Sequence, residues 1–223
     1  MQPDMGSAMV FLAIMIGMLF MAGANWKWLL GIFGGGLVAG IGYIIGIWKF
    51  GWWSPLMKHQ LNRFLVLFDS TIDRQGVGWN AWQAKIAIGN GGFFGQGIGS
   101  GTQSAGDFLP EQWTDFIFAV LCEELGFIGA SVILIMFGVL LYRGIKIAMT
   151  SRDFYGSLVA IGVVTMFFFH VFENVGMNIG IMPIAGIPLP FISYGGSAVL
   201  ANFMGIALLE NIYMRRESLS FRE

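Results

Sequence analysis

Two carboxylates four residues apart could supply acid–base chemistry in this sequence. Glu111 and Asp115 follow Pro110, which interrupts the preceding structure, and Asp115 stands directly before a long apolar run. Partial burial and the neighbouring Glu111 would both raise the pKa of Asp115, as suits a general base that works near neutral pH. A carboxylate in the first turn of a helix is also stabilised by the helix dipole. The sequence leaves both roles open for Asp115.

A glycine-rich segment precedes these acids. Seven glycines fall within residues 89–101, and glycine permits positive φ and the close approach of another surface. A cradle of backbone N–H groups for a phosphate is one interpretation, and a turn-rich loop without ligand is the other. The spacing does not match the dinucleotide-binding fingerprint, and no buried strand precedes it.

A second irregular segment covers residues 181–197. It is apolar enough for a membrane, but Pro183, Pro188, Pro190 and the pair Gly195–Gly196 prevent a regular helix. Its unpaired backbone groups need partners in the protein or in a water-filled cavity. We expect a re-entrant or extended loop here, with a tight hairpin as the alternative.

Ionisable side chains also occur inside apolar runs, where they are candidates for function by default. Glu123 and Glu124 lie roughly 12–13 Å beyond Asp115 at ~1.5 Å per helical residue. His170, Glu173 and Asn174 stand at i, i+3 and i+4 and could form one polar stripe on a helix. Hydrogen bonding between helices is the alternative role for each of these residues.

The composition defines the elements that must position these residues. Of 223 residues, 56% are strongly or moderately apolar and 11% are charged, and the mean hydropathy is +0.72. A soluble domain of this size cannot bury so much apolar surface, and a disordered chain would be far more polar. Twelve Lys and Arg against thirteen Asp and Glu leave no basic excess for nucleic acid. The single Cys122 excludes an internal disulfide.

These numbers predict an all-α polytopic membrane protein that forms a single membrane domain over residues 1–223. Apolar runs long enough to span a bilayer predict five transmembrane helices. Between the second and third lies a large polar loop, residues 51–115, with a short interfacial helix around residues 79–88. The five spans are expected at about residues 6–24, 28–50, 116–142, 154–177 and 198–214.

The distribution of Lys and Arg predicts the orientation, because basic residues favour the cytoplasmic side. Three short segments expected at one end of the bundle carry Lys27, the group Arg143, Lys146 and Arg152, and the tail residues Arg215, Arg216 and Arg222. That end is therefore expected in the cytoplasm with the C-terminus, and the loop 51–115 outside. An odd number of spans with an outside start leads us to expect further residues before Met1.

Several motifs together resemble the SEDS family, which includes RodA, FtsW and SpoVE, and the spacing is somewhat more similar to RodA. The resemblance runs along the whole chain. It covers the C-terminal half of a family whose members have about ten spans. The motifs are QPDMGS at residues 2–7, IAIGNGG at 86–92, GTQ at 101–103, FLPE at 108–111, TDFIFA at 114–119, EELG at 123–126 and PLPFISYGGS at 188–197.

The resemblance implies a bacterial cell-membrane glycosyltransferase that polymerises lipid II into peptidoglycan during elongation. Asp115 matches the acidic residue taken as catalytic. A class B penicillin-binding protein transpeptidase and other elongation-complex membrane proteins are the implied partners. The resemblance implies no certain cofactor, and a divalent cation, Mg²⁺ or Mn²⁺, could be held by Asp115 and Glu111. The implied substrate-binding residues are Lys58, Arg63 and Lys85 for the pyrophosphate, with Gln103, Glu111, Thr114 and Ser193.

Three departures from the family pattern are Trp113, Cys122 and Glu173, none of which touches the Thr114–Asp115 motif. The resemblance also implies that an absent first half completes the substrate cavity, which leaves the activity of the isolated chain open. Two other functions remain as alternatives. One is a flippase or transporter of the lipid-linked precursor, and the other is a non-catalytic scaffold for a cell-wall complex.

Overall fold

The computed structural model describes residues 5–51, 53, 58–68, 76–106 and 108–216, and within them every regular element is a helix. The predicted all-α membrane fold is therefore confirmed. The motif residues 2–4, Trp52 and Arg222 lie outside the described residues.

Four helices are long and apolar enough to cross a membrane. The first is continuous from Trp26 to Phe50 and consists of α2 (Trp26–Leu29), a π-helical turn η1 (Leu30–Gly34) and α3 (Gly35–Phe50). The others are α7 (Ile117–Met149), α8 (Phe154–Ile179) and α9 (Gly196–Met214). The first expected span is the shorter apolar helix α1 (Met5–Met21).

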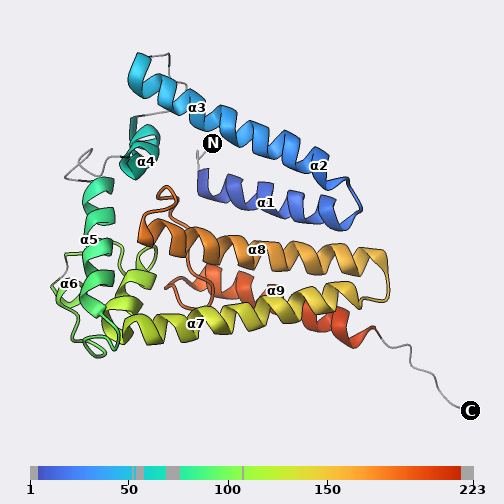
Figure 1. Cartoon of the computed structure of the whole chain (residues 1–223). Coiled ribbons are helices and arrows are strands. Elements are labelled where there is room, and N and C mark those ends of the chain that lie inside the picture. Colours follow the sequence, from blue (N-terminus) through green and yellow to red (C-terminus); the bar gives the residue numbers. More distant parts are fainter. Residues whose placement is uncertain (1–4, 52, 54–57, 69–75, 107, 217–223) are drawn as a thin grey trace, which may run out of the picture.

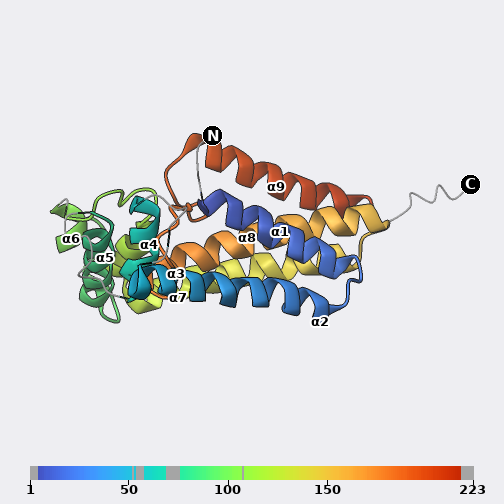
Figure 2. The same ribbon diagram turned by 90° about the horizontal axis from the view of Figure 1, so that it is seen from above.

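Helix α8 is the centre of the bundle, with α1 and α7 packed along it and α9 on a further side (Figures 1 and 2). Its small residues permit close packing: a side chain at Gly162 would touch Met18 of α1. Buried Ala160, Val164 and Phe167 form a core with Leu209 of α9. Many large apolar side chains on the outer faces are exposed, as lipid-facing surfaces require.

The helix from Trp26 to Phe50 diverges from this bundle (Figure 1). Three pairs of glycines four residues apart, Gly31/Gly35, Gly36/Gly40 and Gly42/Gly46, predict tight packing of this helix. Yet side chains built at the first five of these glycines would meet nothing within 4 Å. These five glycines lack such neighbours because the helix meets α1 only through its start and otherwise tilts away, whereas Gly46, nearer its end, is buried.

Helix α7 continues to Met149, beyond the end expected near residue 142. Arg143 and Lys146 therefore lie on its last turns and not in a loop. Both are good helix formers, and their long stems let the charged ends reach water from a helical backbone. The connection to α8 is reduced to residues 150–153.

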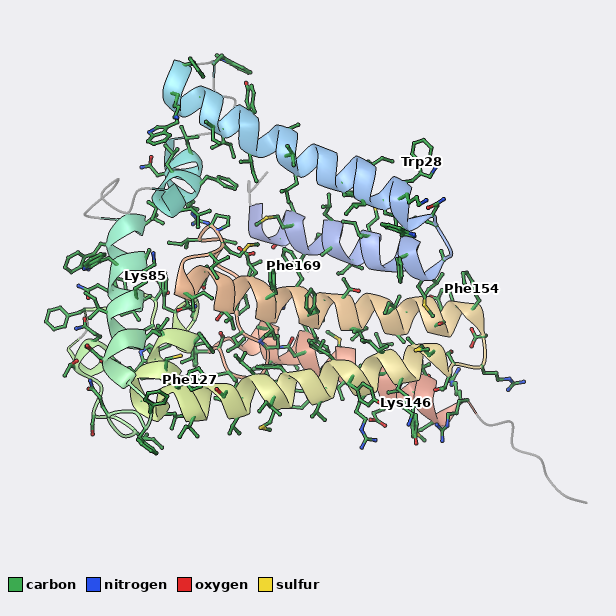
Figure 3. All side chains as sticks on the ribbon, in the orientation of Figure 1. Trp28, Lys85, Phe127, Lys146, Phe154 and Phe169 are labelled. Atoms are coloured by element: carbon green, nitrogen blue, oxygen red, sulfur yellow. The ribbon has the colours of Figure 1, made fainter. Side chains whose placement is uncertain are left out.

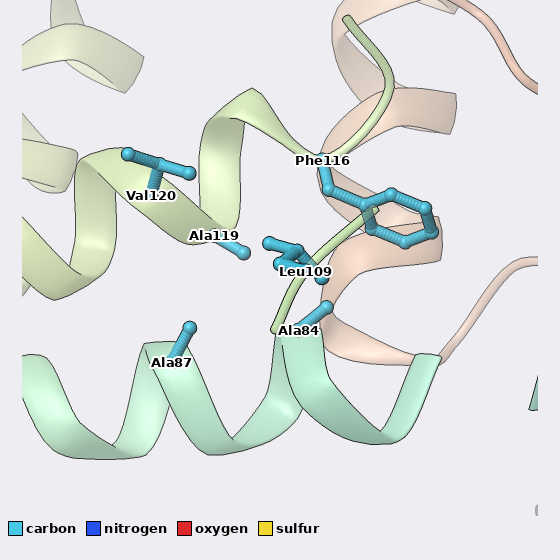
Figure 4. Packing of buried hydrophobic residues seen from close by; sticks show 6 residues of the cluster. All are labelled: Ala84, Ala87, Leu109, Phe116, Ala119 and Val120. Carbon is cyan, nitrogen blue, oxygen red and sulfur yellow. The ribbon is translucent and has the colours of Figure 1, made fainter. Parts of the chain in front are cut away.

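The polar segment contributes three short helices: α4 (Lys58–Phe68), α5 (Val77–Gly91) and α6 (Thr102–Ala105). The expected helix around residues 79–88 is α5, which lies crosswise over one end of the bundle (Figure 1). Ala84 and Ala87 of α5 are fully buried, and their small side chains let the helix approach Phe116, Ala119 and Leu109 closely (Figure 4). This contact fixes the chain on both sides of Asp115.

Candidate active site

Asp115 lies in the turn that leads into α7, and its side chain does not cap that helix. The helix begins at Ile117, its N-cap residue is Phe116, and no side-chain hydrogen bond caps it. Phe116 is almost completely buried, whereas Asp115 is half-buried. The carboxylate therefore lies at a protein–solvent boundary and makes no hydrogen bond to the N-terminal N–H groups of the helix.

The turn before Asp115 depends on an unusual backbone conformation at Glu111. Its φ is 54°, in the left-handed region that few residues other than glycine adopt. Its carbonyl oxygen accepts hydrogen bonds from the backbone N–H groups of Thr114, Asp115 and Phe116, each at 3.2 Å. The Thr114 hydroxyl lies 3.1 Å from Glu111 Oε2. The strained turn thus gathers both carboxylates and the hydroxyl of Thr114 in one place.

Two buried asparagines of α8 hold the backbone of Asp115. Asn174 Nδ2 donates to the Asp115 carbonyl oxygen at 2.9 Å and to the Ile187 carbonyl oxygen at 2.8 Å. Asn178 Nδ2 lies 3.2 Å from the same Asp115 oxygen. Asn174 stood in the expected polar stripe, but Asn178 was missed. Its position four residues after Asn174, in an otherwise apolar helix, was the available signal.

The proline-rich segment forms the other wall of the site. As predicted, it is not helical between residues 181 and 195. Ser193 Oγ donates to the Thr114 carbonyl oxygen and accepts from the Leu189 N–H, both at 2.7 Å. A side chain added at Gly186 would lie 3.2 Å from Asp115 Oδ2. The segment therefore presents bare backbone beside the carboxylate, and the lack of a side chain at Gly186 lets the two approach closely.

The surroundings of Asp115 raise the pKa of its carboxyl. Burial is the main cause, and the negative charge of Glu111 acts in the same direction. The positive charge of Arg63, on α4, and a hydrogen bond from Thr114 lower the pKa but do not reverse the shift. Arg63 is thus close enough to act on the Asp115 charge, which unites two of the predicted site residues.

Lys85 and Gln103 lie elsewhere. Lys85, on the exposed side of α5, packs against Gly180 at the C-terminal end of α8, where a positive charge is favoured by the helix dipole. The Gln103 N–H donates to Glu123 Oε1 at 2.8 Å, so this residue is anchored eight residues beyond Asp115. Lys58 starts α4, but its side chain lies outside the described residues.

The glycine-rich segment is docked on α7 by its backbone. The Gln96 and Gly97 N–H groups donate to the Glu123 and Glu124 carbonyl oxygens at 2.9 and 3.0 Å. In return, the Phe127 N–H donates to the Gly92 carbonyl oxygen at 2.9 Å. These bonds exist because α7 is broken at Gly126, whose φ is 67°.

The acids of α7 complete this attachment. Glu123 is fully buried and accepts from the N–H groups of Gln103 and Ser104, while Glu124 Oε1 accepts from the Gly99 N–H at 3.0 Å. These N–H groups of the segment donate to oxygen atoms of α7 and are not available to a phosphate. The phosphate-cradle interpretation is therefore not supported, and Glu123 and Glu124 are loop anchors and not helix–helix partners.

The predicted polar stripe on α8 separates into different environments. Glu173 and Asn174 are fully buried, whereas His170 is half-buried. Neither carboxylate oxygen of Glu173 has a hydrogen-bond partner among the described residues. Among all the residues that the structure describes, no group of three or more His, Cys, Asp and Glu residues could hold a metal ion.

Comparisons with known proteins give one matching family and several similar relatives. Residues 1–218 match the family described as cell cycle proteins, FtsW, RodA and SpoVE. Peptidoglycan glycosyltransferase MrdB of Escherichia coli strain K12 is 38% identical over 219 residues, which cover 98% of this chain and 57% of MrdB. Stage V sporulation protein E of Bacillus subtilis strain 168 is 39% identical over 211 residues, 95% of this chain and 55% of that protein.

A solved structure is similar over the entire chain. It comes from work on "structural coordination of polymerization and crosslinking by a peptidoglycan synthase complex". The superposition has a TM-score of 0.74 at 28% identity and covers 100% of this chain and 58% of that chain. This chain therefore spans a little over half the length of the proteins it matches.

Proposed function

Because the chain belongs to the family of FtsW, RodA and SpoVE, we propose that it carries the catalytic half of a peptidoglycan glycosyltransferase that acts on lipid II. Its relatives MrdB and RodA are named peptidoglycan glycosyltransferases. The motif similarity to RodA supports a role in cell elongation. The loop 51–115 would then face the outside of a bacterial cell membrane, with the C-terminus in the cytoplasm.

The proposed reaction is an inverting glycosyl transfer. The 4-hydroxyl oxygen of GlcNAc in one lipid-linked disaccharide attacks the anomeric carbon of another chain. A new C–O bond forms as the bond to the lipid pyrophosphate breaks, and the pyrophosphate leaves with the bonding electron pair. Asp115 takes the proton of the attacking hydroxyl at a carboxylate oxygen, which makes the nucleophile stronger as the bond forms.

The observation that carries this proposal is the state of the Asp115 carboxylate. It does not cap α7, it is half-buried beside the bare backbone of Gly186, and its pKa is raised by burial and by Glu111. A raised pKa makes a carboxylate a better proton acceptor near neutral pH. Asn174 and Asn178 hold the backbone carbonyl of Asp115, so the backbone at this residue is fixed without any contribution from the carboxylate.

The leaving pyrophosphate requires positive charge, and Arg63 is the described basic residue whose charge reaches Asp115. We assign Lys58 and Lys85 to the same task at longer range. Glu111 and Asp115 are two carboxylates close enough to influence each other, which fits Mg²⁺, an ion commonly held by one or two carboxylates together with substrate phosphates. Such an ion would supply charge neutralisation at the pyrophosphate.

A crosslinking partner follows from the same family membership. The similar solved structure belongs to a complex that coordinates polymerization with crosslinking. By analogy, a class B penicillin-binding protein is the proposed partner, together with other membrane proteins of the elongation complex. Ser193 is given a positioning role, since its hydroxyl attaches the proline-rich segment beside Asp115. Gln103 is given a more distant one, since its N–H attaches α6 to Glu123 of α7.

The test compares Asp115→Asn with Glu111→Gln in the intact protein, with lipid II as substrate and glycan products separated on gels. Asparagine keeps the shape of the side chain but cannot accept the proton, so a loss of about 10²–10⁴-fold is expected. Glu111→Gln should lose less. Normal polymerisation by the Asp115→Asn variant would remove Asp115 from the mechanism. Wild-type protein that moves lipid II without polymerising it would be a transporter, and one with neither activity a scaffold.

A further inference from the structure

A polar pocket lies at the end of the bundle opposite Asp115, between the start of α8 and the end of α9. Its volume is about 220 Å³, and we call it the basic pocket. Figure 3 shows Phe154 and Lys146 at this end, and Lys85 and Phe127 at the other. The residues that define the basic pocket are Arg152, Asp153, Tyr155, Val159, Asn211 and Arg215.

The two arginines of the basic pocket come from different segments and face one cavity. Arg152 belongs to the connection before α8, and Arg215 is the C-cap residue of α9. Both are exposed, and within the described residues neither guanidinium has a carboxylate in ion-pair range. Two like charges that face one cavity repel each other, so this arrangement is typical of a site that an anion completes.

One acid also lines the basic pocket, and its single carboxylate offsets only one of the two guanidinium charges. Asp153 is the N-cap of α8, and its Oδ2 accepts the Gly156 N–H at 3.0 Å. The pocket thus keeps a net positive charge. Asn211 adds an amide that can donate a hydrogen bond to an oxygen ligand.

The other side of the basic pocket is apolar. Val159 and Leu208 line it, and the neighbouring Tyr155 and Leu208 are exposed on the outer surface of the bundle. A ligand here would meet guanidinium and amide groups at the end of the helices and hydrocarbon along their sides. A phospholipid has this division between a phosphate head and acyl chains.

We propose that the basic pocket binds the phosphate group of an anionic phospholipid from the adjoining leaflet. Arginine forks match phosphate oxygens in bidentate geometry. Basic pockets between transmembrane helices bind anionic head groups in this way. The site is separate from the catalytic residues and lies at the far end of α8, the helix that holds Asp115 through Asn174.

Native mass spectrometry of the intact protein tests the proposal with phosphatidylglycerol and phosphatidylcholine as probes. Wild type should retain phosphatidylglycerol in preference. Arg152→Gln and Arg215→Gln should each weaken its retention about fivefold, as expected for one basic residue near anionic lipid. The matched control is Arg143→Gln, since Arg143 is exposed at the end of α7 but does not line the pocket; it should retain the lipid like wild type.

A second arm identifies the source of the phosphate. Inorganic phosphate at millimolar concentration is added to lipid-depleted protein, and stabilisation against heat is measured in wild type and in Arg215→Gln. Phosphate could stabilise the wild type but not the Arg215→Gln variant while neither protein prefers phosphatidylglycerol. That result would overturn the lipid as the ligand and assign the site to free phosphate. Equal retention of phosphatidylglycerol by all variants, with no phosphate effect, would overturn the proposal. Asn211→Ala changes an exposed residue of the basic pocket without changing its charge, and it should also weaken the retention of phosphatidylglycerol.

Discussion

The Ser193 hydroxyl donates a hydrogen bond of 2.7 Å to the Thr114 carbonyl oxygen, joining residues 79 positions apart in the sequence. Ser193 Oγ also accepts from the Leu189 N–H, so one side chain closes its own loop and attaches it beside Asp115. The adjacent Tyr194 N–H donates to the Trp113 carbonyl oxygen at 2.8 Å. The proline-rich segment and the approach to α7 therefore move as one unit.

Replacing this hydroxyl should loosen the site without removing a reacting group. Ser193→Ala leaves two buried backbone groups without partners, at a cost of roughly 1–3 kcal/mol. Hydrogen exchange should become faster at Leu189 and Tyr194, and polymerisation should fall. Tyr194→Phe is the control, because that side chain is 81% exposed and its backbone bond stays intact. Unchanged exchange in Ser193→Ala would show that the loop is held by packing alone.

The pH dependence of polymerisation should report the charges around Asp115. The base acts when deprotonated, so activity should fall as the pH drops through the Asp115 pKa. Glu111→Gln removes a cause of the raised pKa and should move this acid limb to lower pH, whereas Arg63→Gln should move it to higher pH. Rates measured over a pH series give both shifts. Shifts in the same direction would contradict the electrostatic assignment.

Three glycines of the glycine-rich segment should respond to alanine in a graded way. Gly95 has φ 80° and its added side chain would collide with the Glu124 carbonyl, so Gly95→Ala should destabilise most. Gly99 has φ 74° with open space around it, which leaves only the backbone strain of about 1–2 kcal/mol. Gly89 is helical and unobstructed, so Gly89→Ala should be neutral or stabilising. Thermal unfolding of the three variants gives the order, and equal effects would refute the docked arrangement.

The predicted orientation can be tested with single cysteines in a Cys122→Ala background. Ser100 and Thr150 are exposed and lie at opposite ends of the structure. An impermeant maleimide should label the Ser100→Cys variant in intact cells, and the Thr150→Cys variant only after permeabilisation. The unsubstituted background controls for nonspecific reaction. Labelling of Thr150→Cys in intact cells would invert the orientation and remove the basis for chemistry outside the cell.

Apolar runs were sufficient to predict the helices, but their ends and contacts were not. The helix α7 was expected to stop before Arg143 because charge was taken to mark a loop, yet long basic side chains reach water from helical turns. The glycine pairs between Gly31 and Gly46 predict close packing because small residues permit contact. However, most of them have no other helix beside them. The local sequence is enough to predict which segments are helical. The contacts of a helix depend in addition on where the other helices lie.

The candidate site was predicted in part. Asp115, Glu111, Thr114 and Arg63 were named from the sequence, and the structure brings them together. Glu123 could not be interpreted correctly, since its partners are backbone groups of a four-residue helix about twenty positions earlier. Asn178 stands four residues after Asn174, which places both amides on one face of the helix, but its role becomes visible only when the Asp115 carbonyl is placed beside it.

The backbone exchange between the glycine-rich segment and the break at Gly126 has a consequence for evolution. Phe94 and Ile98 are more than two-thirds exposed, so we expect substitutions at both positions to be tolerated among related proteins. The bonds of Gly92, Gln96 and Gly97 with α7, in contrast, fix the number of residues between them. Surface loops usually accept insertions and deletions. The glycine-rich segment should tolerate many substitutions while its length stays constant. One added residue would move each later N–H donor away from the carbonyl oxygen of α7 that it now pairs with.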